Sequence, residues 1–339
     1  MNTHNAKRKS NILPLHIDTT SFTERQSKSN TYSSFWRRAN KRQLPVLILL
    51  TMLFFSLFLN FIQHNQKASQ APDLIYNSHD PLPPIPLTEN SHAIIIAGHA
   101  IYTGAPTPDD IYKEDNWVLE PYQKRGRQIN TFIEHIQKGI DLLRHDLKAV
   151  LIFSGGETRP NAGPRSESLS YWQIARILLD SNTELSAEEK SRLSERMITE
   201  EYARDSFENM LFSICRFSEM LGNYPTKITV VGFEFKRKRF EDLHRHAIQY
   251  PLESFHYIGI DPKIEDPARE EGELLNSYKP FEKDLYGCHG ILKQKRIIRN
   301  PFRRRHAYAA SCPVLAPLIN YCPSNNALYK GPLPWTSAP

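Results

Sequence analysis

The stretch from Glu201 to Asn209 concentrates charged and amide side chains immediately before an apolar helical pattern. Asp205 has a residue type that caps helix N-termini, and Glu208, three residues later, completes a capping-box pattern. Capping does not explain Arg204, which precedes the cap. An arginine there would supplement the helix dipole in holding an oxyanion, with Glu201 as the partner that orients it. Asn209 falls away from the apolar stripe of the helix, so packing gives no reason for it.

Glycines and potential acid–base residues follow two apolar runs. Gly98 ends the first run and is followed by His99, a candidate acid or base, although a lone histidine is more often a polar turn residue. Gly155 and Gly156 follow the second run, where free amides near a helix start would bind phosphate or carboxylate. An ordinary strand–helix turn is the alternative. Glu167 lies in the first turn of the next helix, either as a general base or as a partner of the helix dipole.

A Lys-Arg-Lys-Arg run contains Lys236 and Arg239 at a predicted helix start, an unfavourable place for positive charge. An anionic ligand would offset these cations, although Glu234 and Glu241 offer partial neutralisation. With a reference pKa near 10.4, Lys236 is predicted to be a fixed cation. The chain has no GxSxG, HExxH, CxxC or Walker pattern and no metal-ligand spacing, so we predict no metal site and identify no cofactor.

Alternating apolar runs and helical stripes supply the elements that would position these residues. Strands are predicted at 93–98, 149–153, 228–232 and 255–260, and helices at about 129–143, 166–179, 186–197, 207–221 and 236–249. This alternation predicts an α/β fold with a doubly wound, mainly parallel sheet in a Rossmann-like three-layer arrangement. Ligands gather at the carboxyl ends of strands in such folds, so we expect the site there.

Four segments, taken in order, resemble the DUF218 (SanA/YdcF-like) family over about residues 92–262. They are Ile94 to Gly98, Ser154-Gly155-Gly156 with Ser166-Glu167-Ser168, Glu201 to Asn209, and Val230 to Phe240. The resemblance implies functional roles for Arg204 and Glu167. Members usually carry His where this chain has Lys236, while Arg239 is kept. A family mechanism that used that histidine to carry a proton would therefore not transfer directly.

Residues 1–43 are predicted to form a disordered basic tail, with nine Lys or Arg against two acids. Because this tail carries a net charge of +7 and the rest of the chain −1, we predict no nucleic-acid partner. Residues 44–62 are uncharged and long enough to span a bilayer, which predicts a signal anchor rather than a cleaved signal peptide or a core helix. Flanking positive charge predicts a type II orientation with a cytosolic tail. The endoplasmic reticulum or Golgi is favoured, with a mitochondrial membrane as the alternative.

Beyond the anchor, residues 63–90 are predicted to be a Pro-rich stalk, 91–285 the α/β domain, and 286–339 a basic and Pro-rich extension packed on it. The basic run within the extension is interpreted as a solvated face, with contact to anionic headgroups as the alternative. Cys215 lies in an apolar helical pattern and is predicted to be a buried thiol. Two of the three C-terminal cysteines are expected to pair, with the pairing left open; they are Cys288, Cys312 and Cys322.

Taken together, these features predict a single-pass membrane protein whose luminal domain binds, and as an enzyme would turn over, a small anionic ligand that carries phosphate. The bacterial relatives of the DUF218 family are linked to envelope integrity, so the resemblance implies cell-wall or glycan metabolism. The alternative is a non-catalytic, membrane-tethered binding or trafficking module that keeps the fold without the reaction. Whether the chain is an enzyme and what its oligomeric state is stay open.

Overall fold

The computed structural model describes residues 46, 48–62, 89–125, 128–263 and 266–336. The chain divides into two compact units, Met1–Pro81 and Leu82–Pro339. In the first unit, residues 48–62 are helical, and the large hydrophobic side chains of residues 48–61 are exposed. No helix in the described ranges has the length and apolar character needed to cross a membrane. The predicted anchor at 44–62 lies partly outside these ranges, and the tail at 1–43 and most of the stalk lie wholly outside them.

The second unit contains a five-stranded parallel sheet in the order β5-β4-β1-β6-β7. Its strands are β1 (His92–Ala97), β4 (Ala149–Ser154), β5 (Met197–Glu200), β6 (Lys227–Gly232) and β7 (Phe255–Gly259). A short antiparallel pair, β2 (Ile101–Tyr102) and β3 (Trp117–Val118), follows the first strand. The chain winds outward from β1 in one direction, returns, and then winds in the other. The strand order therefore reverses between β1 and β6, which is where such folds bind ligands.

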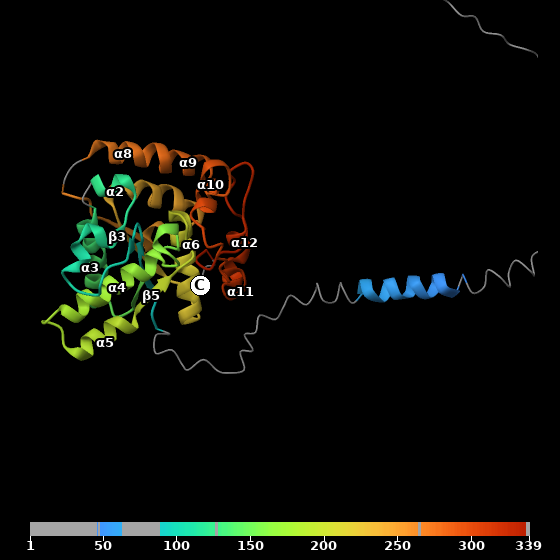
Figure 1. The fold of residues 1–339 in the computed structure, drawn as a ribbon, viewed down its shortest axis with the longest axis horizontal. Coiled ribbons are helices and arrows are strands. Elements are labelled where there is room, and N and C mark those ends of the chain that lie inside the picture. The colour runs from blue at the N-terminus through green and yellow to red at the C-terminus, as the bar shows by residue number, and fades with distance from the viewer. Residues whose placement is uncertain (1–45, 47, 63–88, 126–127, 264–265, 337–339) are drawn as a thin grey trace, which may run out of the picture. The chain divides into compact units, whose positions relative to one another are not determined.

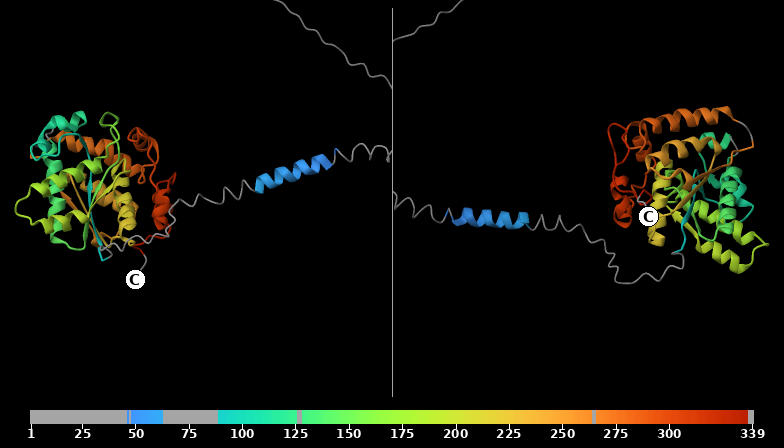
Figure 2. Two further views of the ribbon diagram at one scale, coloured as in Figure 1. Left: turned by 60° about the horizontal axis from the view of Figure 1, so that its bottom comes forward. Right: turned by 180° about the vertical axis from the view of Figure 1, so that it is seen from behind.

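Helices cover both faces of the sheet. One face carries α3 (Ile129–His145), α4 (Glu167–Ser181) and α5 (Ala187–Glu195), and the other carries α6 (Ser206–Leu221), the π-helix η5 (Arg239–His244) and α7 (Arg245–Ala247). Figures 1 and 2 show α3, α4 and α5 on the side of the sheet opposite α6. Side chains alternate along β1, so Ile95 packs in one core and Ile94 and Ile96 in the other. The parallel sheet with helices on both faces confirms the prediction of a Rossmann-like α/β fold.

The remaining helices are short and lie mainly after the last strand. They are η1 (Asp110–Tyr112), η2 (Glu114–Asn116), α2 (Pro121–Arg125), η3 (Pro160–Ala162), η4 (Glu234–Lys236), η6 (Leu252–Ser254), α8 (Pro267–Glu273), η7 (Leu274–Tyr278), α9 (Lys279–Lys283), α10 (Gly290–Ile298), α11 (Tyr308–Ser311), η8 (Pro313–Leu315) and α12 (Ala316–Ile319). In Figure 1, α8, α9 and α10 run along one end of the folded body, above α2.

Two predicted helices differ from the observed elements. The helix predicted at 186–197 begins as expected, with Ser186 accepting a hydrogen bond from the Glu189 amide at 3.1 Å, but it ends at Glu195. The next residues form the edge strand β5, whose four residues are too few to show an alternating pattern. The helix predicted at 236–249 is instead divided among η4, η5 and α7.

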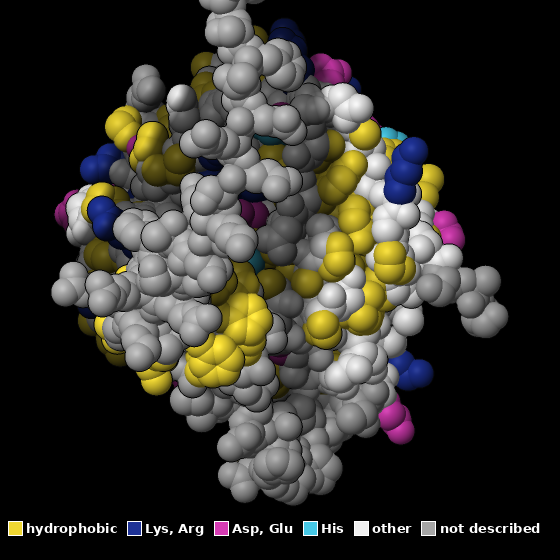
Figure 3. Space-filling view, turned by 90° about the vertical axis from the view of Figure 1, so that its right-hand side faces the viewer, with side chains coloured by type: hydrophobic (Ala, Val, Ile, Leu, Met, Phe, Trp, Pro, Cys, Tyr) yellow, Lys and Arg dark blue, Asp and Glu magenta, His cyan; other side chains and the backbone are white. Residues whose placement is uncertain are grey.

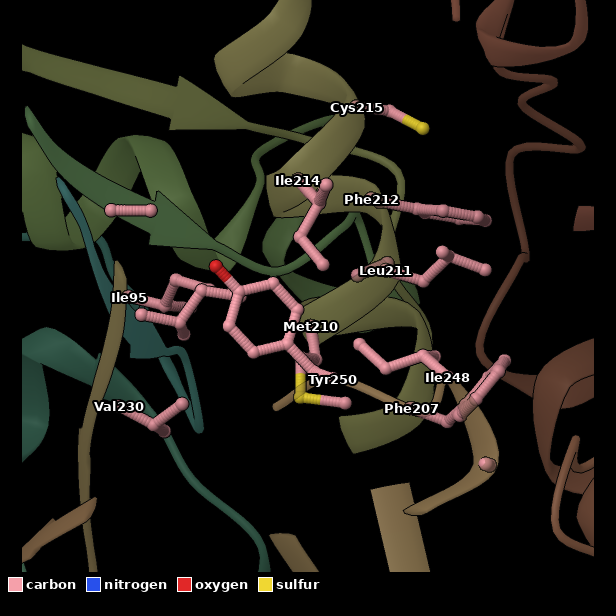
Figure 4. Packing of buried hydrophobic residues seen from close by; sticks show 14 of the residues in the cluster. Ile95, Phe207, Met210, Leu211, Phe212, Ile214, Cys215, Val230, Ile248 and Tyr250 are labelled. Carbon is pink, nitrogen blue, oxygen red and sulfur yellow. The ribbon is translucent and has the colours of Figure 1, made fainter. Parts of the chain in front are cut away.

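The helix α6 packs against the sheet and also against the C-terminal segment. Figure 4 shows Met210 and Ile214 on the side of α6 that faces Ile95 of the sheet, whereas Phe212 points away toward the C-terminal segment. There its ring centroid lies 5.2 Å from that of Tyr308. Residues after 285 thus complete the core on this face; they include Tyr286, Leu292, Tyr308, Cys312, Leu315, Leu318 and Leu333. On the face shown in Figure 3, charged side chains of both signs are scattered among hydrophobic ones.

The cysteines resolve into one disulfide and two thiols. Cys288 and Cys322 form the disulfide, which joins the start of the C-terminal segment to its later part. Cys215 is a buried free thiol, which confirms the prediction made from its apolar helical pattern. Cys312, one of the three candidates for pairing, is the second buried free thiol.

Candidate functional site

A cavity of about 730 Å³ opens at the carboxyl ends of β1 and β6, where the strand order reverses. Its walls come from these strand ends, the starts of α4 and α6, the α8–η7 segment and the end of α10. Eight of the twelve predicted site residues line it: Gly98, His99, Glu167, Arg204, Asp205, Asn209, Lys236 and Arg239. Glu201, Gly155, Gly156 and Glu208 are not among its lining residues.

The glycines at the strand ends make room for a carboxylate. A Cβ atom added to Gly98 would lie 2.6 Å from the Cβ of Glu167, and one added to Gly155 would lie 2.8 Å from its Oε2. Gly155 also has a φ of +152°, which favours glycine. Glu167 is buried and accepts a hydrogen bond from Thr158. The close packing explains why glycine is needed at both positions, and it holds the Glu167 side chain over the strand ends.

The glycine amides themselves are occupied, so the prediction that they are free to bind an anion is wrong. The Gly98, Gly155 and Gly156 amides donate to backbone carbonyls at 2.7, 3.0 and 2.7 Å. The first amides of α4 are also satisfied, because Glu167 N donates to a glycine carbonyl at 3.1 Å and Leu169 N donates to the Ser166 hydroxyl at 3.0 Å. Neither the glycine turn nor the start of α4 offers an unpaired donor for a ligand.

Arg204 is held in place by Glu208. Its Nε and backbone amide both donate to Glu208 Oε2 at 2.9 Å, and a terminal guanidinium nitrogen lies 2.5 Å from Oε1. Asp205 caps α6 by accepting from the Glu208 amide at 2.9 Å, as predicted. Arg296 then pairs with Asp205 at 2.6 Å and with Glu208 at 3.3 Å. The start of α6 is therefore an internal network of two acids and two arginines.

The expected pairing of Glu201 with Arg204 is wrong. Glu201 accepts hydrogen bonds from Thr199 at 3.0 Å and Ser166 at 3.2 Å, and its closest cation is Arg304 at 4.0 Å. The residue points to the far side of the turn because it directly follows the edge strand β5, in which side chains alternate between faces.

Asn209 belongs to a buried network that the sequence reasoning missed. The Ser154 hydroxyl lies 3.0 Å from Asn209 Oδ1 and donates to Glu200 at 2.6 Å. Glu200 is fully buried at the end of β5 and also accepts from the Tyr308 hydroxyl at 3.2 Å. Burial raises the pKa of Glu200 to about 7, against hydrogen bonds that favour its charged form. Nothing in the sequence around Glu200, which directly precedes Glu201, indicates that its side chain is buried.

Lys236 lies among aromatic rings rather than acids. Its ammonium nitrogen is 4.8 Å from the centroid of the Phe233 ring, 5.7 Å from that of Phe235, and 3.5 Å from Nδ1 of His99. Burial, followed by repulsion from Arg239, lowers the pKa of Lys236 to about 7. The expectation of a fixed cation is therefore wrong, because it used a solvated reference value.

His99 is kept neutral beside Lys236. Burial and then the charge of Lys236 hold the pKa of His99 well below its ordinary value. Its ring stacks on Phe233 with centroids 5.0 Å apart, and its Nε2 is buried without a hydrogen-bond partner in the described part of the chain. Its Nδ1 is therefore the ring nitrogen available to exchange a proton with the Lys236 amine, with the tautomer inferred from these contacts.

Glu234 and Glu241, expected to neutralise the Lys-Arg-Lys-Arg run in part, both pair with Arg237, at 2.6 and 3.1 Å. Arg239 is buried and instead pairs with Glu273 of α8, with Nε and Oε1 3.2 Å apart. This pair joins α8 to the helix that follows β6. Arg239 thus has a structural partner at the cavity wall.

Two cations from the C-terminal basic run also line the cavity, which corrects its interpretation as a solvated face. Lys295 donates to the carbonyl of Asn276 at 2.5 Å, and Arg299 donates to the carbonyl of Arg204 at 3.0 Å. Neither forms an ion pair with a described carboxylate within 4.0 Å. The sequence signal was the run of basic residues without acids, but only the fold shows that part of this run lies at the carboxyl ends of the strands.

The cavity is predominantly positive. It is lined by seven Lys or Arg residues and four carboxylates: Arg159, Arg204, Lys236, Arg239, Arg269, Lys295 and Arg299 against Glu167, Asp205, Asp266 and Glu273. Such an arrangement can bind an anion, and the group formed by Lys236, His99 and Glu167 can exchange protons with it. Within the described ranges, the three-residue cluster of potential metal-ligand atoms lies at Cys288, His289 and Cys322, and its two cysteines form the disulfide.

The chain is similar to a curated fungal protein. It is 33% identical over 270 residues to the uncharacterized protein YOR238W of Saccharomyces cerevisiae, a match that covers 66% of this chain and 88% of the yeast protein. No protein-family model matches the chain. No solved structure matches it significantly.

Proposed function

The chain belongs to the family of the uncharacterized yeast protein YOR238W, and from its cavity we propose that the α/β domain binds a small anionic ligand that carries phosphate. The DUF218 resemblance supports the same proposal, because its motifs contribute Gly98, Glu167, Arg204 and Arg239 to the cavity wall. The cavity volume of about 730 Å³ suits a ligand of nucleotide or sugar-phosphate size.

One observation carries the proposal: three basic side chains of the cavity lack a carboxylate partner within 4.0 Å among the described residues. They are Lys236, Lys295 and Arg299. The positive charges repel one another, since Arg299 and Arg239 both contribute to lowering the pKa of Lys236 and of Lys295, after burial. An anion placed among them would offset this repulsion, and a phosphate would do so with several acceptor oxygens.

Turnover of the ligand is the leading form of the proposal, with Lys236, His99 and Glu167 as the proton-transfer groups. A lysine with a pKa near 7 can donate or accept a proton at neutral pH, so the replacement of the family's usual histidine does not by itself argue against a reaction. Arg299 and Lys295 would stabilise negative charge on the reacting group.

A second candidate is a non-catalytic, tethered binding module. It is favoured by the ion pairs that hold Arg204 on Glu208 and Arg239 on Glu273, since both arginines carry the family motif yet serve the fold here. Measurement of ligand turnover by the full-length protein separates this candidate from the first.

The proposed location is a membrane of the secretory pathway, with residues 44–62 as the anchor and a mitochondrial membrane as the alternative. The disulfide between Cys288 and Cys322 supports a luminal domain, because disulfides persist in oxidising compartments. Involvement in cell-wall or glycan metabolism rests on the DUF218 resemblance alone.

Calorimetric titration of the full-length protein with pyrophosphate, nucleotides and sugar phosphates tests the binding proposal. The variant of choice is Arg299→Met, because Arg204→Ala would also break the network at the start of α6. We expect Arg299→Met to weaken binding about tenfold or more, as for loss of a charge-assisted hydrogen bond. Arg305→Met, at an exposed position of the same basic run, should bind as wild type does. Absence of binding to every phosphate compound, or equal loss in both variants, would refute the proposal.

A further inference from the structure

The amine of Lys236 has surroundings that suit a nucleophile better than a fixed cation. It lies in the cavity wall against the rings of Phe233 and Phe235, at 4.8 and 5.7 Å from their centroids. No carboxylate within the described ranges approaches it to 4.0 Å. Burial and the absence of a counter-ion favour an uncharged amine, which has a free electron pair, against the cation–π attraction that these rings offer to the charged form.

Charged groups from four helices surround this amine. Arg239 of η5 and Arg299 at the end of α10 repel its proton, while Glu273 of α8 and Glu167 at the start of α4 attract it. Each carboxylate is already engaged, Glu273 with Arg239 and Glu167 with Thr158. Repulsion therefore adds to burial, and both favour the neutral amine.

His99 completes the arrangement. Its Nδ1 lies 3.5 Å from the Lys236 nitrogen, close enough to receive a proton from it directly or after a small movement. The neighbouring cations, Arg299 and Lys295, can hold a phosphate in the same cavity. One cavity thus combines an amine whose neutral form is favoured, a proton acceptor and an anion anchor.

We propose that Lys236 forms an imine with an aldehyde or ketone that also carries a phosphate group. This inference rests on the proposed function, because the bound phosphate would bring the carbonyl group to the amine. The amine nitrogen attacks the carbonyl carbon, a C–N bond forms, and the carbonyl oxygen takes up a proton. The nitrogen gives up its two protons through His99, one balancing the proton already taken up by the oxygen and the other passing to that oxygen. The C–O bond then breaks, and the oxygen leaves as water. The imine hydrolyses by the reverse sequence, and no oxidant or reductant is needed.

Other lysines provide a contrast within the same chain. Lys295 also faces the cavity, but its amine donates to the Asn276 carbonyl at 2.5 Å. Lys238 is exposed to solvent, two residues beyond Lys236. A lysine of ordinary pKa is neutral in only ~0.04% of molecules at pH 7, against about half for a pKa near 7, a roughly thousandfold difference.

The test is reaction of the full-length protein with pyridoxal 5′-phosphate, an aldehyde that carries phosphate, followed by borohydride reduction and peptide mass mapping. We expect Lys236 to be labelled at least about tenfold faster than Lys238 at pH 7, with a rate that reaches half its maximum near pH 7. This comparison lies within wild-type protein and does not depend on any variant folding. Labelling of Lys236 no faster than Lys238 would overturn the inference.

Two further arms separate this inference from the proposed function. Pyridoxal, which lacks phosphate, should label Lys236 at least about tenfold more slowly, and pyrophosphate should protect it. If pyrophosphate binds but Lys236 forms no imine, the nucleophile inference fails and the anion-binding proposal stands. If Lys236 reacts equally with both aldehydes and pyrophosphate does not bind, the amine is nucleophilic but the anion-binding proposal fails, and with it the phosphate-bearing substrate class.

Discussion

Replacement of Lys236 by methionine should stabilise the protein, and by an amount that falls as pH rises. Methionine has a similar length, carries no charge and suits the aromatic walls formed by Phe233 and Phe235. In the folded protein the pKa of Lys236 is lowered from 10.5 to about 7, chiefly by burial. At any pH below 10.5, folding therefore costs free energy, because the unfolded chain binds the lysine proton more tightly than the folded protein does.

The magnitude follows from the difference between the two pKa values. A difference of about 3.5 corresponds to ~5 kcal/mol when the amine is protonated in both states, below pH 7. Because Lys236 is only part-buried, solvent screens the charge, and we expect about half of this, ~2 kcal/mol. Between pH 7 and 10.5 the unfolded chain binds more protons than the folded protein, so the stability of the wild type rises with pH in this window.

The assay is urea denaturation of the full-length protein, followed by tryptophan fluorescence at pH 6, 7, 8 and 9. The Lys236→Met variant should exceed the wild type by ~2 kcal/mol at pH 6 to 7 and by ~1 kcal/mol at pH 9. Lys238→Met, at an exposed neighbouring position, should show no such trend. A Lys236→Met advantage that is absent, or that stays constant across this pH range, would refute the assignment of a neutral amine to the cavity.

Three further predictions concern the framework of the site. In urea denaturation, the unfolding free energy of Glu200→Gln should match that of the wild type near pH 4.5 and exceed it by up to ~3 kcal/mol above pH 7. The reason is that the folded pKa of about 7 makes the wild type lose stability as pH rises from 4.5 to 7. A difference that stays constant with pH would contradict this prediction. Replacing Cys288 and Cys322 by serine should lower the unfolding free energy by about 3–4 kcal/mol for a sequence separation of 34, and a reductant should affect wild type but not the variant. Gly98→Ala should lower the unfolding free energy by ~1–3 kcal/mol in thermal denaturation, since its new Cβ would lie 2.6 Å from a glutamate side chain. Gly272→Ala, whose new Cβ meets nothing within 4 Å, should raise the unfolding free energy by ~0.5–1 kcal/mol. Equal effects of the two substitutions would mean that close packing at the strand end does not require glycine at position 98.

The sequence by itself determined the layout of the sheet and where its ligand site should lie. Local chemistry was sufficient here: the apolar run at 93–98 can only be buried on both faces, and helical stripes between such runs require parallel strands with crossovers. The cap at Asp205 was also predictable, because capping depends on residues three positions apart. By contrast, the short edge strand β5 was missed, because four residues next to a helix carry no period of their own.

Only the tertiary structure decided the chemistry of the cavity. The Lys236 pKa depends on burial, Arg239 and Arg299, and Arg299 lies far along the chain in a run that the sequence pattern predicts to be an exposed basic face. The partner of Arg204 could not be chosen from sequence either, since Glu201 and Glu208 are both near it, and only the direction of the helix and the edge strand separates them. Burial and long-range charge act through space, so their effect on an ionisable group appears only once the chain is folded.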